Sequence, residues 1–250
     1  MLTPERHRII LQLLKDKNVV KIQEIMDLTN SSESTIRRDL SQLEEQKFLK
    51  RIHGGASSLQ GKLNEPSMVE KSSKNLQEKS RIAKFAASLV EEGDCIFLDA
   101  GSTVIEMIEF LPKKDIVVVT NGLMHFVPLL NKGIPTYFIG GLAKSKTNAL
   151  IGRGALAGLD LYRFDKCFMG VNGIHTQFGF TTPDQEEALV KQKAISLSRE
   201  AYVLADSTKF SEISFAKITD LDNASIITNE LDDELREQYL NRTMIKVVTA

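Results

Sequence analysis

The 250-residue chain has no tryptophan, two cysteines and only 6% aromatic residues. Cys95 and Cys167 lie in apolar runs with no CxxC spacing and no nearby group of histidines. Neither a disulfide framework nor a metal site is therefore indicated, and buried structural thiols are favoured. No apolar run approaches the roughly 18 residues that a membrane span needs, and residues 1–10 are charged where a signal peptide has its apolar core. We expect a cytoplasmic protein with no cofactor and no membrane partner.

An excess of positive charge is also lacking, because 32 Lys and Arg residues face 33 Asp and Glu residues and the net charge is −1. Binding to duplex DNA depends on neutralised phosphates, so this average by itself argues against a nucleic-acid partner. Residues 34–53 nevertheless hold more basic than acidic side chains, namely Arg37, Arg38, Lys47, Lys50, Arg51 and His53 against Asp39, Glu44 and Glu45. A small basic surface on a neutral chain is typical of a modular DNA-binding protein.

The amino-terminal part of the chain predicts a winged helix-turn-helix domain. Residues 3–5, Thr-Pro-Glu, favour a helix start, because they supply a capping hydroxyl, a proline and an acid for the first turn. A brief strand at residues 19–20, a second helix around residues 22–26 and a third helix from about Glu33 follow. Residues 48–55 alternate and end in a glycine pair, which predicts a hairpin. Three helices and a hairpin in this order are the winged helix-turn-helix plan.

The third predicted helix has an apolar face and a polar face. Its apolar positions form one stripe, and the residues opposite the stripe are Ser34, Arg38 and Ser41, with Arg37 flanking it. Hydroxyls can bind phosphate oxygens or bases, and guanidinium groups can bind guanine bidentately or anchor the backbone. Three amphipathic helices also occur in interaction domains that bind no DNA. The residues expected to contact DNA are Lys21, Ser32, Ser34, Thr35, Arg37, Arg38, Ser41, Lys50, Arg51, His53, Gly54 and Gly55.

The composition changes after this module. We assign residues 1–57 to the DNA-binding domain, residues 58–74 to a linker that is helical in part, and residues 75–250 to a second domain. There, apolar runs that end in small or polar residues alternate with helical stretches, at residues 95–99, 116–120, 136–140, 167–170, 202–206, 226–228 and 245–248. Buried strands that alternate with helices predict an α/β fold with a mostly parallel sheet covered on both faces.

Ligands of such a sheet bind beyond the carboxyl ends of its strands. The residues that follow four of the predicted strands suit a phosphorylated polyol, and they are Asp99, Gly101, Ser102, Thr103, Thr120, Asn121, Gly140, Gly141 and Lys209. Glycine permits close backbone approach, and hydroxyls at a helix start favour an anion. Each loop taken singly is more simply a helix cap or a turn. His125 and His175 are expected to be structural or surface histidines.

Two motifs, STIRRDL at residues 34–40 and RIHGGA at residues 51–56, resemble the helix-turn-helix of the DeoR family. The rest of the chain resembles the sensor domain of that family, through residues 99–103, 120–122, 140–141, 165–173, 187–191 and 206–210. The resemblance implies a bacterial transcriptional regulator, usually a repressor of sugar catabolism, whose sensor has the ribose-phosphate isomerase-like fold and binds a phosphorylated sugar. It adds Asp165, Gly173, Glu187 and Lys191 to the expected effector-binding residues.

Within the family, residues 1–7 and 71–76 are most similar to the branch that regulates fructose operons in Gram-positive bacteria, which implies fructose 1-phosphate as effector. Ser102 stands where many members carry threonine, and this change keeps the hydroxyl. Glu187 and Lys191 have a simpler interpretation as a solvated i,i+4 ion pair.

The leading hypothesis is a repressor that binds double-stranded operator DNA as a homo-oligomer, a dimer or a tetramer, with half-sites about 34 Å apart or a multiple of that. A phosphorylated sugar would release it from the DNA. The alternative is an enzyme, a sugar-phosphate isomerase or deaminase with an accessory helical domain, because Asp99, Glu187 and Lys209 include types able to act as a general base or an electrostatic anchor. A third possibility is a DNA-binding scaffold whose sensor binds no metabolite.

Overall fold

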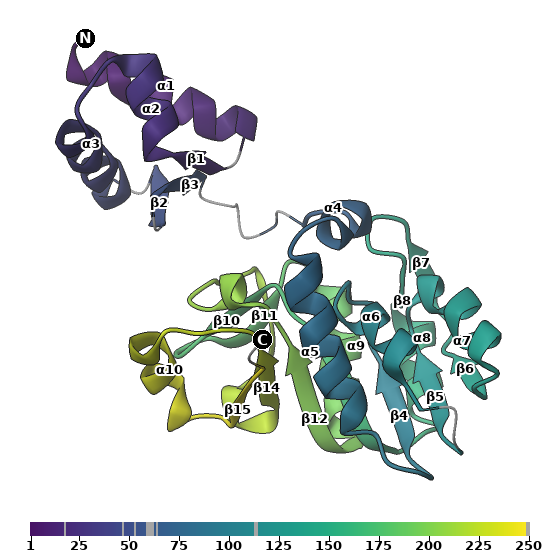
Figure 1. Cartoon of the computed structure of the whole chain (residues 1–250). Coiled ribbons are helices and arrows are strands. Elements are labelled where there is room, and N and C mark those ends of the chain that lie inside the picture. Colours follow the sequence, from purple (N-terminus) through teal and green to yellow (C-terminus); the bar gives the residue numbers. More distant parts are fainter. Residues whose placement is uncertain are drawn as a thin grey trace. The chain divides into compact units, whose positions relative to one another are not determined.

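The computed structural model describes residues 1–17, 19–46, 48–52, 54–58, 63, 65–112 and 115–248. The chain divides into two compact units, Met1–Gly61 and Lys62–Ala250 (Figure 1). The helix within residues 65–74 fits the expectation of a partly helical linker at residues 58–74, but these residues make buried contacts within the second unit. His53, one of the expected DNA contacts, lies outside the described residues.

The first unit has the predicted order of helices and strands. Its described elements are α1 (Thr3–Lys17), β1 (Val19–Lys21), α2 (Ile22–Thr29), α3 (Glu33–Glu45), β2 (Leu49–Ile52) and β3 (Gly55–Ser58), and the strands form an antiparallel sheet in the order β1-β3-β2. α3 begins after Ser32, whose Oγ accepts a hydrogen bond from the backbone N–H of Thr35 at 3.4 Å. Ile36, Leu40 and Leu43 of α3 are at most 1% exposed, which confirms the predicted apolar stripe.

A buried ion pair joins α1 to α3. Asp39 is 2% exposed on the inner side of α3, and its two oxygens accept hydrogen bonds from Arg6 Nε at 2.6 Å and Arg6 Nη2 at 3.1 Å. His7 Nε2 lies 3.3 Å from the same carboxylate. The hydrogen bond to Asp39 raises the pKa of Arg6 above its ordinary value. Asp39 therefore fixes the orientation of α3 and is not a DNA-facing acid.

The second unit is built on a parallel sheet. Among the described residues the sheet has seven strands, in the order β15 (Ile245–Val247), β14 (Ser225–Thr228), β12 (Ser198–Leu204), β9 (Phe164–Gly170), β4 (Cys95–Leu98), β5 (Val117–Thr120) and β6 (Thr136–Phe138). Each neighbouring pair is parallel. All seven predicted strands are in this sheet, so the expected parallel α/β domain is confirmed.

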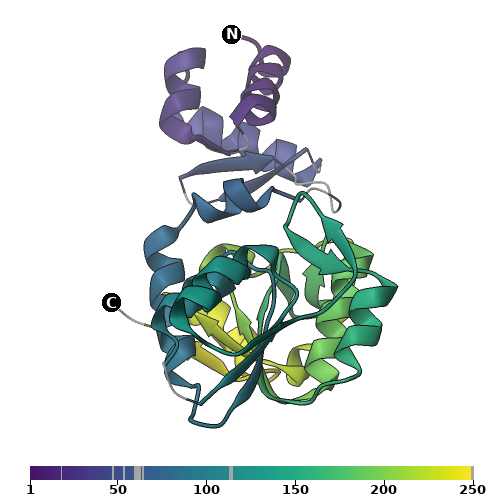
Figure 2. The same ribbon diagram turned by 90° about the vertical axis from the view of Figure 1, so that its right-hand side faces the viewer.

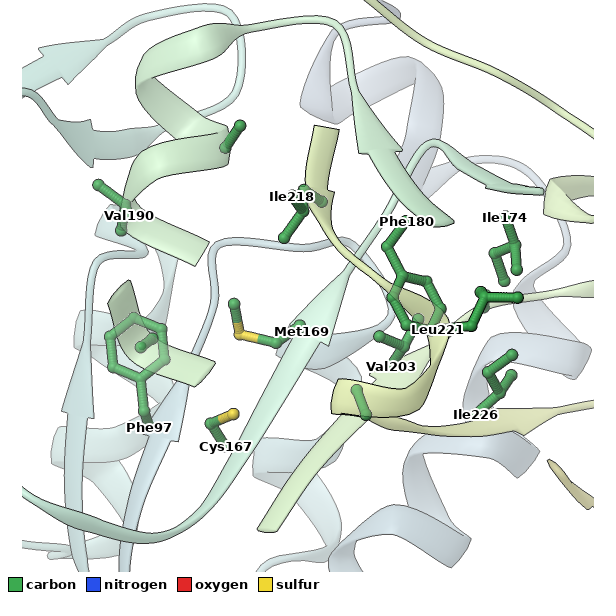
Figure 3. Close-up of a cluster of buried hydrophobic side chains, with 14 of the residues drawn as sticks. Phe97, Cys167, Met169, Ile174, Phe180, Val190, Val203, Ile218, Leu221 and Ile226 are labelled. Carbon is green, nitrogen blue, oxygen red and sulfur yellow. The ribbon is translucent and has the colours of Figure 1, made fainter. Parts of the chain in front are cut away.

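Helices cover both faces of this sheet (Figures 1 and 2). The described helices are α4 (Met68–Ser72), α5 (Leu76–Ser88), α6 (Val104–Phe110), α7 (Phe126–Lys132), α8 (Arg153–Leu159), α9 (Gln185–Ser196) and α10 (Asp233–Leu240). Side chains alternate along each strand, so Ile96 and Leu98 pack with α5 and α6, whereas Phe97 packs with α8 and α9. Figure 3 shows part of the apolar cluster on the α8 and α9 side of the sheet, with Phe97, Cys167, Met169 and Val190. Cys167 is fully buried and Cys95 is half-buried, and both are free thiols.

Two smaller sheets were not predicted from the sequence. One is antiparallel in the order β10 (Gly173–His175), β11 (Gly179–Thr182), β13 (Ala216–Thr219), and the other pairs β7 (Leu142–Lys144) with β8 (Ala149–Ile151). These strands are short, and most of them mix apolar residues with Gly, Thr, Lys or His, so they lack the apolar run that marked the strands of the main sheet. Three short 3-10 turns complete the described elements: η1 (Leu123–His125), η2 (Ser207–Lys209) and η3 (Leu221–Asn223).

Replacing Asp39 tests the buried ion pair of the first unit. We expect Asp39→Ala to destabilise this unit by roughly 3 kcal/mol, because the guanidinium of Arg6 would stay buried without its carboxylate. Hydrogen–deuterium exchange of α1 and α3 is the suitable measurement. Tyrosine fluorescence would not report the unfolding of the first unit, because all four tyrosines, at 137, 162, 202 and 239, lie in the second unit. Glu45→Ala, at the exposed end of α3, is the control and should change stability by less than about 0.5 kcal/mol. Equal exchange in the two variants would contradict the role of Asp39.

Candidate DNA-binding surface and effector site

α3 presents its polar face on the surface of the first unit. Ser34, Arg37 and Arg38 are exposed, and Ser41 is half-exposed. Arg37 Nη2 lies 2.6 Å from Glu33 Oε1, and both side chains are 54% exposed. An ion pair this exposed contributes little stability, so Arg37 can exchange Glu33 for another anion at little cost. Arg38 makes no hydrogen bond or ion pair with the part of the chain that the structure describes. The two adjacent guanidinium groups are thus both at the surface.

The β2–β3 hairpin is tied to the same helix. Arg51 Nη1 donates a hydrogen bond to Ser41 Oγ at 2.7 Å, and the Arg51 N–H donates to Glu44 Oε1 at 2.7 Å. Gly54 has a φ of +76° at the turn, a conformation that favours glycine. A Cβ on Gly55 would lie 2.1 Å from the carbonyl oxygen of Val20, so this position has no room for a side chain. The glycine pair therefore shapes the hairpin.

The other expected DNA contacts in the first unit border these two elements. Ser32 Oγ lies 2.9 Å from Thr35 Oγ1 and 3.1 Å from Ser34 Oγ at the start of α3. Lys21 is exposed at the end of β1, where it pairs with Gly55, and Lys50 is half-exposed on β2. The start of α3, its outer face and the adjacent strands hold all the described candidates.

In the second unit, the central site residue is a buried carboxylate at the end of β4. Asp99 is 1% exposed, and its Oδ2 accepts hydrogen bonds from the Gly170 N–H at 2.9 Å and from Lys191 Nζ at 2.5 Å. Gly170 ends the neighbouring strand β9 and Lys191 lies on α9. A Cβ on Gly101 would lie 3.2 Å from the Cα of Gly170, so a larger residue would push these two loops slightly apart. Asp99 therefore joins two strand ends to α9.

A second buried carboxylate lies one helical turn before Lys191. Glu187 Oε1 accepts hydrogen bonds from Thr147 Oγ1 at 2.6 Å and Lys144 Nζ at 3.1 Å. Burial alone would raise the pKa of Glu187, but the charge of Lys191 and these two donors hold it below its ordinary value. The simpler interpretation of Glu187 and Lys191 as a solvated ion pair is therefore wrong, because both are 6% exposed.

Lys144 is the centre of a group of carboxylates. Its Nζ lies 2.5 Å from Glu65 Oε2, 2.9 Å from Asp184 Oδ2 and 3.1 Å from Glu187 Oε1. Burial would lower the pKa of Lys144, but its hydrogen bonds to Glu65 and Asp184 and the charge of Glu187 raise it well above its ordinary value. Glu65, which is 5% exposed, precedes α4 in the chain.

Lysines from four parts of the chain gather near these strand ends. Burial and the positive charges of Lys191 and Lys209 lower the pKa of Lys71, against the opposite effect of Glu65 and Glu187. Burial also lowers the pKa of Lys79, together with Lys209 and against Asp206. Lys79 is 5% exposed and its Nζ donates to the backbone carbonyl of Lys71. Lys71, Lys79, Lys191 and Lys209 thus share one region, where an anion would relieve their mutual repulsion.

Hydroxyl groups are available at the end of β4. Ser102 is 9% and Thr103 7% exposed, and among the described residues neither side chain has a hydrogen-bond partner in the protein. They follow Gly101 in the loop that leads into α6. These hydroxyls are free to bind a ligand.

Thr120 and Asn121 of the next loop are engaged with the protein itself. Thr120 Oγ1 donates to the Leu98 carbonyl at 2.6 Å, and it accepts from the Gly122 N–H at 3.0 Å. Asn121 Oδ1 accepts from the Ala100 N–H at 3.0 Å. The structure gives both residues a role in holding the loops after β4 and β5 together.

Asp165 does not lie with the other expected effector-binding residues. It is the second residue of β9, and its Oδ2 accepts a hydrogen bond from the N–H of Cys95, the first residue of β4, at 3.0 Å. The strands are parallel, so this is the amino edge of the sheet, opposite to Asp99 and Gly170. The prediction for Asp165 is therefore wrong.

Two of the three remaining glycines that were expected to bind the effector have a structural reason at their positions. A Cβ on Gly141, whose φ is +126°, would lie 2.5 Å from the Ile151 carbonyl oxygen, and a Cβ on Gly173 would lie 2.4 Å from the Glu212 carbonyl oxygen. Gly140 has open space around the Cβ position. Close packing explains Gly141 and Gly173 without a ligand.

His125 is fully buried beside the end of β5. Its Nδ1 lies 2.8 Å from Thr120 Oγ1, and its Nε2 has no hydrogen-bond partner among the described residues. Burial lowers the pKa of His125 to about 4, so the ring is neutral at pH 7. This agrees with the expected structural histidine.

No group of three His, Cys, Asp or Glu side chains in the described part of the chain is placed to hold a metal ion. None of the helices described is both long and apolar enough to cross a membrane.

A three-helix winged module with an exposed arginine pair, followed by a parallel α/β unit with a polar site at its strand ends, defines a DNA-binding regulator with a sensor domain. Comparison with known families agrees: residues 6–62 match the DeoR-like helix-turn-helix domain, and residues 74–230 match the DeoR C terminal sensor domain. The chain belongs to the DeoR family of transcriptional regulators.

Individual relatives support this assignment. The chain is 57% identical, over 99% of both proteins, to the uncharacterized HTH-type transcriptional regulator FruR of Bacillus subtilis. It is 35% identical, over 98% of both, to the lactose phosphotransferase system repressor of Staphylococcus aureus. A ribose 5-phosphate isomerase A from Methanocaldococcus jannaschii is similar with a TM-score of 0.42 and 20% identity, over 55% of each chain. With regulators matching along its whole length, the protein is a regulator rather than an enzyme, and the isomerase or deaminase alternative does not hold.

The buried histidine predicts how the stability of the second unit depends on pH. The pKa of His125 is about 4 in the folded state, below the value of about 6.5 in the unfolded chain. The unfolded state therefore binds more protons between these values, and stability falls as the pH is lowered from 6.5 to 4. The loss attributable to His125 is up to about 3 kcal/mol.

Urea unfolding followed by tyrosine fluorescence measures this effect. We expect the loss of stability between pH 6.5 and 4 to be smaller in His125→Gln than in the wild type by that amount. His175→Gln is the control, because His175 is half-exposed in the same unit. The same pH dependence in the wild type and in His125→Gln would show that the histidine is not held neutral.

Proposed function

We propose that this regulator is a repressor that binds operator DNA through α3 and the β2–β3 hairpin. The supporting observation in the first unit is the exposed pair Arg37 and Arg38 on the polar face of α3. Arg51, whose guanidinium reaches Ser41, extends this surface from the helix to the hairpin. The protein would bind as a homo-oligomer, so that two copies of α3 meet half-sites about 34 Å apart, or a multiple of that.

We further propose that a phosphorylated sugar binds at the strand ends of the second unit and releases the DNA. The single observation that carries this proposal is the group of four lysines, Lys71, Lys79, Lys191 and Lys209. One of them, Lys191, binds Asp99, and the unpartnered hydroxyls of Ser102 and Thr103 follow Asp99 in the chain. A phosphate dianion would neutralise the lysines and accept hydrogen bonds from them and from the hydroxyls. Asp206, which is buried and lies near Lys79, and the polar loops would offer acceptors to sugar hydroxyls.

The identity of the sugar rests on sequence similarity. Residues 1–7 and 71–76 are most similar to the fructose-operon branch of the family, and the Bacillus relative is named FruR. A relative named as a lactose phosphotransferase system repressor is also consistent with a sugar-linked effector. We therefore propose fructose 1-phosphate, with other phosphorylated sugars as the comparison set.

Substitution of the arginine pair tests DNA binding. Arg38→Ala should weaken binding to the DNA upstream of the regulated operon by about 5- to 150-fold, because one bidentate contact contributes roughly 1–3 kcal/mol. Arg37→Ala combined with Arg38→Ala should abolish specific binding. Fluorescence anisotropy at fixed salt is the measurement, with Arg153→Ala as the control that removes an exposed charge from the second unit. If the double variant and the control bind equally well, α3 does not read the operator.

A thermal-shift screen tests the effector site. Fructose 1-phosphate should raise the melting temperature, whereas fructose should not. Lys209→Ala and Ser102→Ala should each weaken binding by roughly 10-fold or more, because each loses a hydrogen bond to a charged group. Lys74→Ala, an exposed lysine between α4 and α5, is the matched control and should bind like the wild type. No shift with any phosphorylated sugar would favour a sensor that binds no metabolite.

A further inference from the structure

The carboxylate of Glu65 is bound on one side only. Its Oε2 accepts a hydrogen bond from Lys144 Nζ at 2.5 Å, while Oε1 is buried and has no hydrogen-bond partner among the described residues. Among the described residues, the Nζ of Lys71 lies 3.5 Å from Oε1, too far for a good hydrogen bond but close enough for a strong electrostatic attraction. Glu65 is therefore held firmly by Lys144 and weakly by Lys71.

The two lysines differ in their surroundings. Lys144 is shared by Glu65, Asp184 and Glu187, so it has an excess of negative neighbours. Lys71 instead is attracted by the negative charges of Glu65 and Glu187 and repelled by the positive charges of Lys191 and Lys209. Lys71 is thus the lysine that borders both Glu65 and the proposed anion site.

The backbone around Glu65 and Lys71 is anchored within the second unit. Ser67 and Glu70 form a capping box at the start of α4, the N–H of Met68 donates to the Lys146 carbonyl at 2.9 Å, and Met68 is buried. Along the chain, Glu65 is four positions after Gly61, the last residue of the first unit. The contacts of Glu65 therefore hold the segment at which the second unit begins.

We propose that Lys71 is shared between Glu65 and the bound anion, so that the effector weakens the hold on Glu65 and thereby acts on the segment that leads to the DNA-binding unit. This inference rests on the proposed function, since it assumes an anion near Lys71, Lys191 and Lys209. A phosphate dianion attracts Lys71 away from Glu65 and repels the carboxylate itself. Glu65 is then a positioning residue that competes with the ligand, and α4 is the element through which the two sites are coupled.

Coupling of this kind is reciprocal, and this gives the test its direction. Removing the negative charge of Glu65 should tighten ligand binding, because the competitor and its repulsion are gone. The same change should reduce the effect of the ligand on DNA binding, because the contact through which the ligand acts is missing. A merely structural role would predict weaker ligand binding, the opposite sign.

The first experiment uses the full chain with Glu65→Gln, which preserves the size of the side chain and leaves Lys144 with Asp184 and Glu187. Calorimetry should show at least threefold tighter binding of fructose 1-phosphate than in the wild type. The ratio of operator affinities without and with saturating ligand, measured by anisotropy, should fall at least threefold. Glu237→Gln, at an exposed position of α10, is the charge-matched control and should resemble the wild type in both measurements.

The second variant, Lys71→Gln, tests the other partner. It should weaken fructose 1-phosphate binding at least tenfold and should also lower the affinity ratio. Inorganic phosphate is titrated alongside as a probe of the anion site alone. Unchanged or weaker ligand binding in Glu65→Gln, or an affinity ratio equal to that of the wild type in either variant, would overturn the inference while the proposed function stands. A wild-type protein that binds neither phosphorylated sugars nor inorganic phosphate would overturn both.

Discussion

The buried ion pair between Asp99 and Lys191 is the interaction on which the sensor site depends. A carboxylate that is 1% exposed is stable only when it is paired and hydrogen-bonded, and here Lys191 and the Gly170 N–H meet this requirement. The pair connects the ends of β4 and β9 to α9. From α9 the charged contacts continue through Glu187 and Lys144, so the strand ends and the segment before α4 belong to one electrostatic network.

The first unit also contains a buried ion pair, between Arg6 and Asp39. A module of three short helices has little apolar core, and the pair between Arg6 and Asp39 adds an oriented contact between α1 and α3. The inner side of α3 thus holds a carboxylate, while the outer side carries the arginines. The acid next to Arg38 in the sequence is removed from the DNA-facing surface by its burial, which leaves that face with the positive charge that phosphates require.

The elements with strong periodicity could be predicted from the sequence. Each of the seven sheet strands contains or overlaps an apolar run of the sequence, and α3 has apolar residues at i, i+4 and i+7 after a serine cap. The strands β7, β8, β10, β11 and β13 could not, because most of them mix apolar residues with Gly, Thr, Lys or His and show no apolar run. Within the site, the burial of Lys79 could have been predicted from the sequence, since this residue occupies the same stripe of α5 as Ile82, Ala83 and Ala86. The roles of Lys71 and Glu65 could not have been predicted, because both residues fall in a polar stretch that resembles a linker.

By itself, the amino-acid sequence determined the order of elements, the division into a winged module and a parallel α/β unit, and the polar character of the strand ends. These follow from periodicity and capping, which act between residues close together in the chain. Only the tertiary structure decided which charges meet. Asp165, two residues before Cys167 in the same strand, went to the far edge of the sheet, whereas Glu65 came to lie against Lys144, because contacts between charges distant in sequence depend on strand direction and on packing between elements.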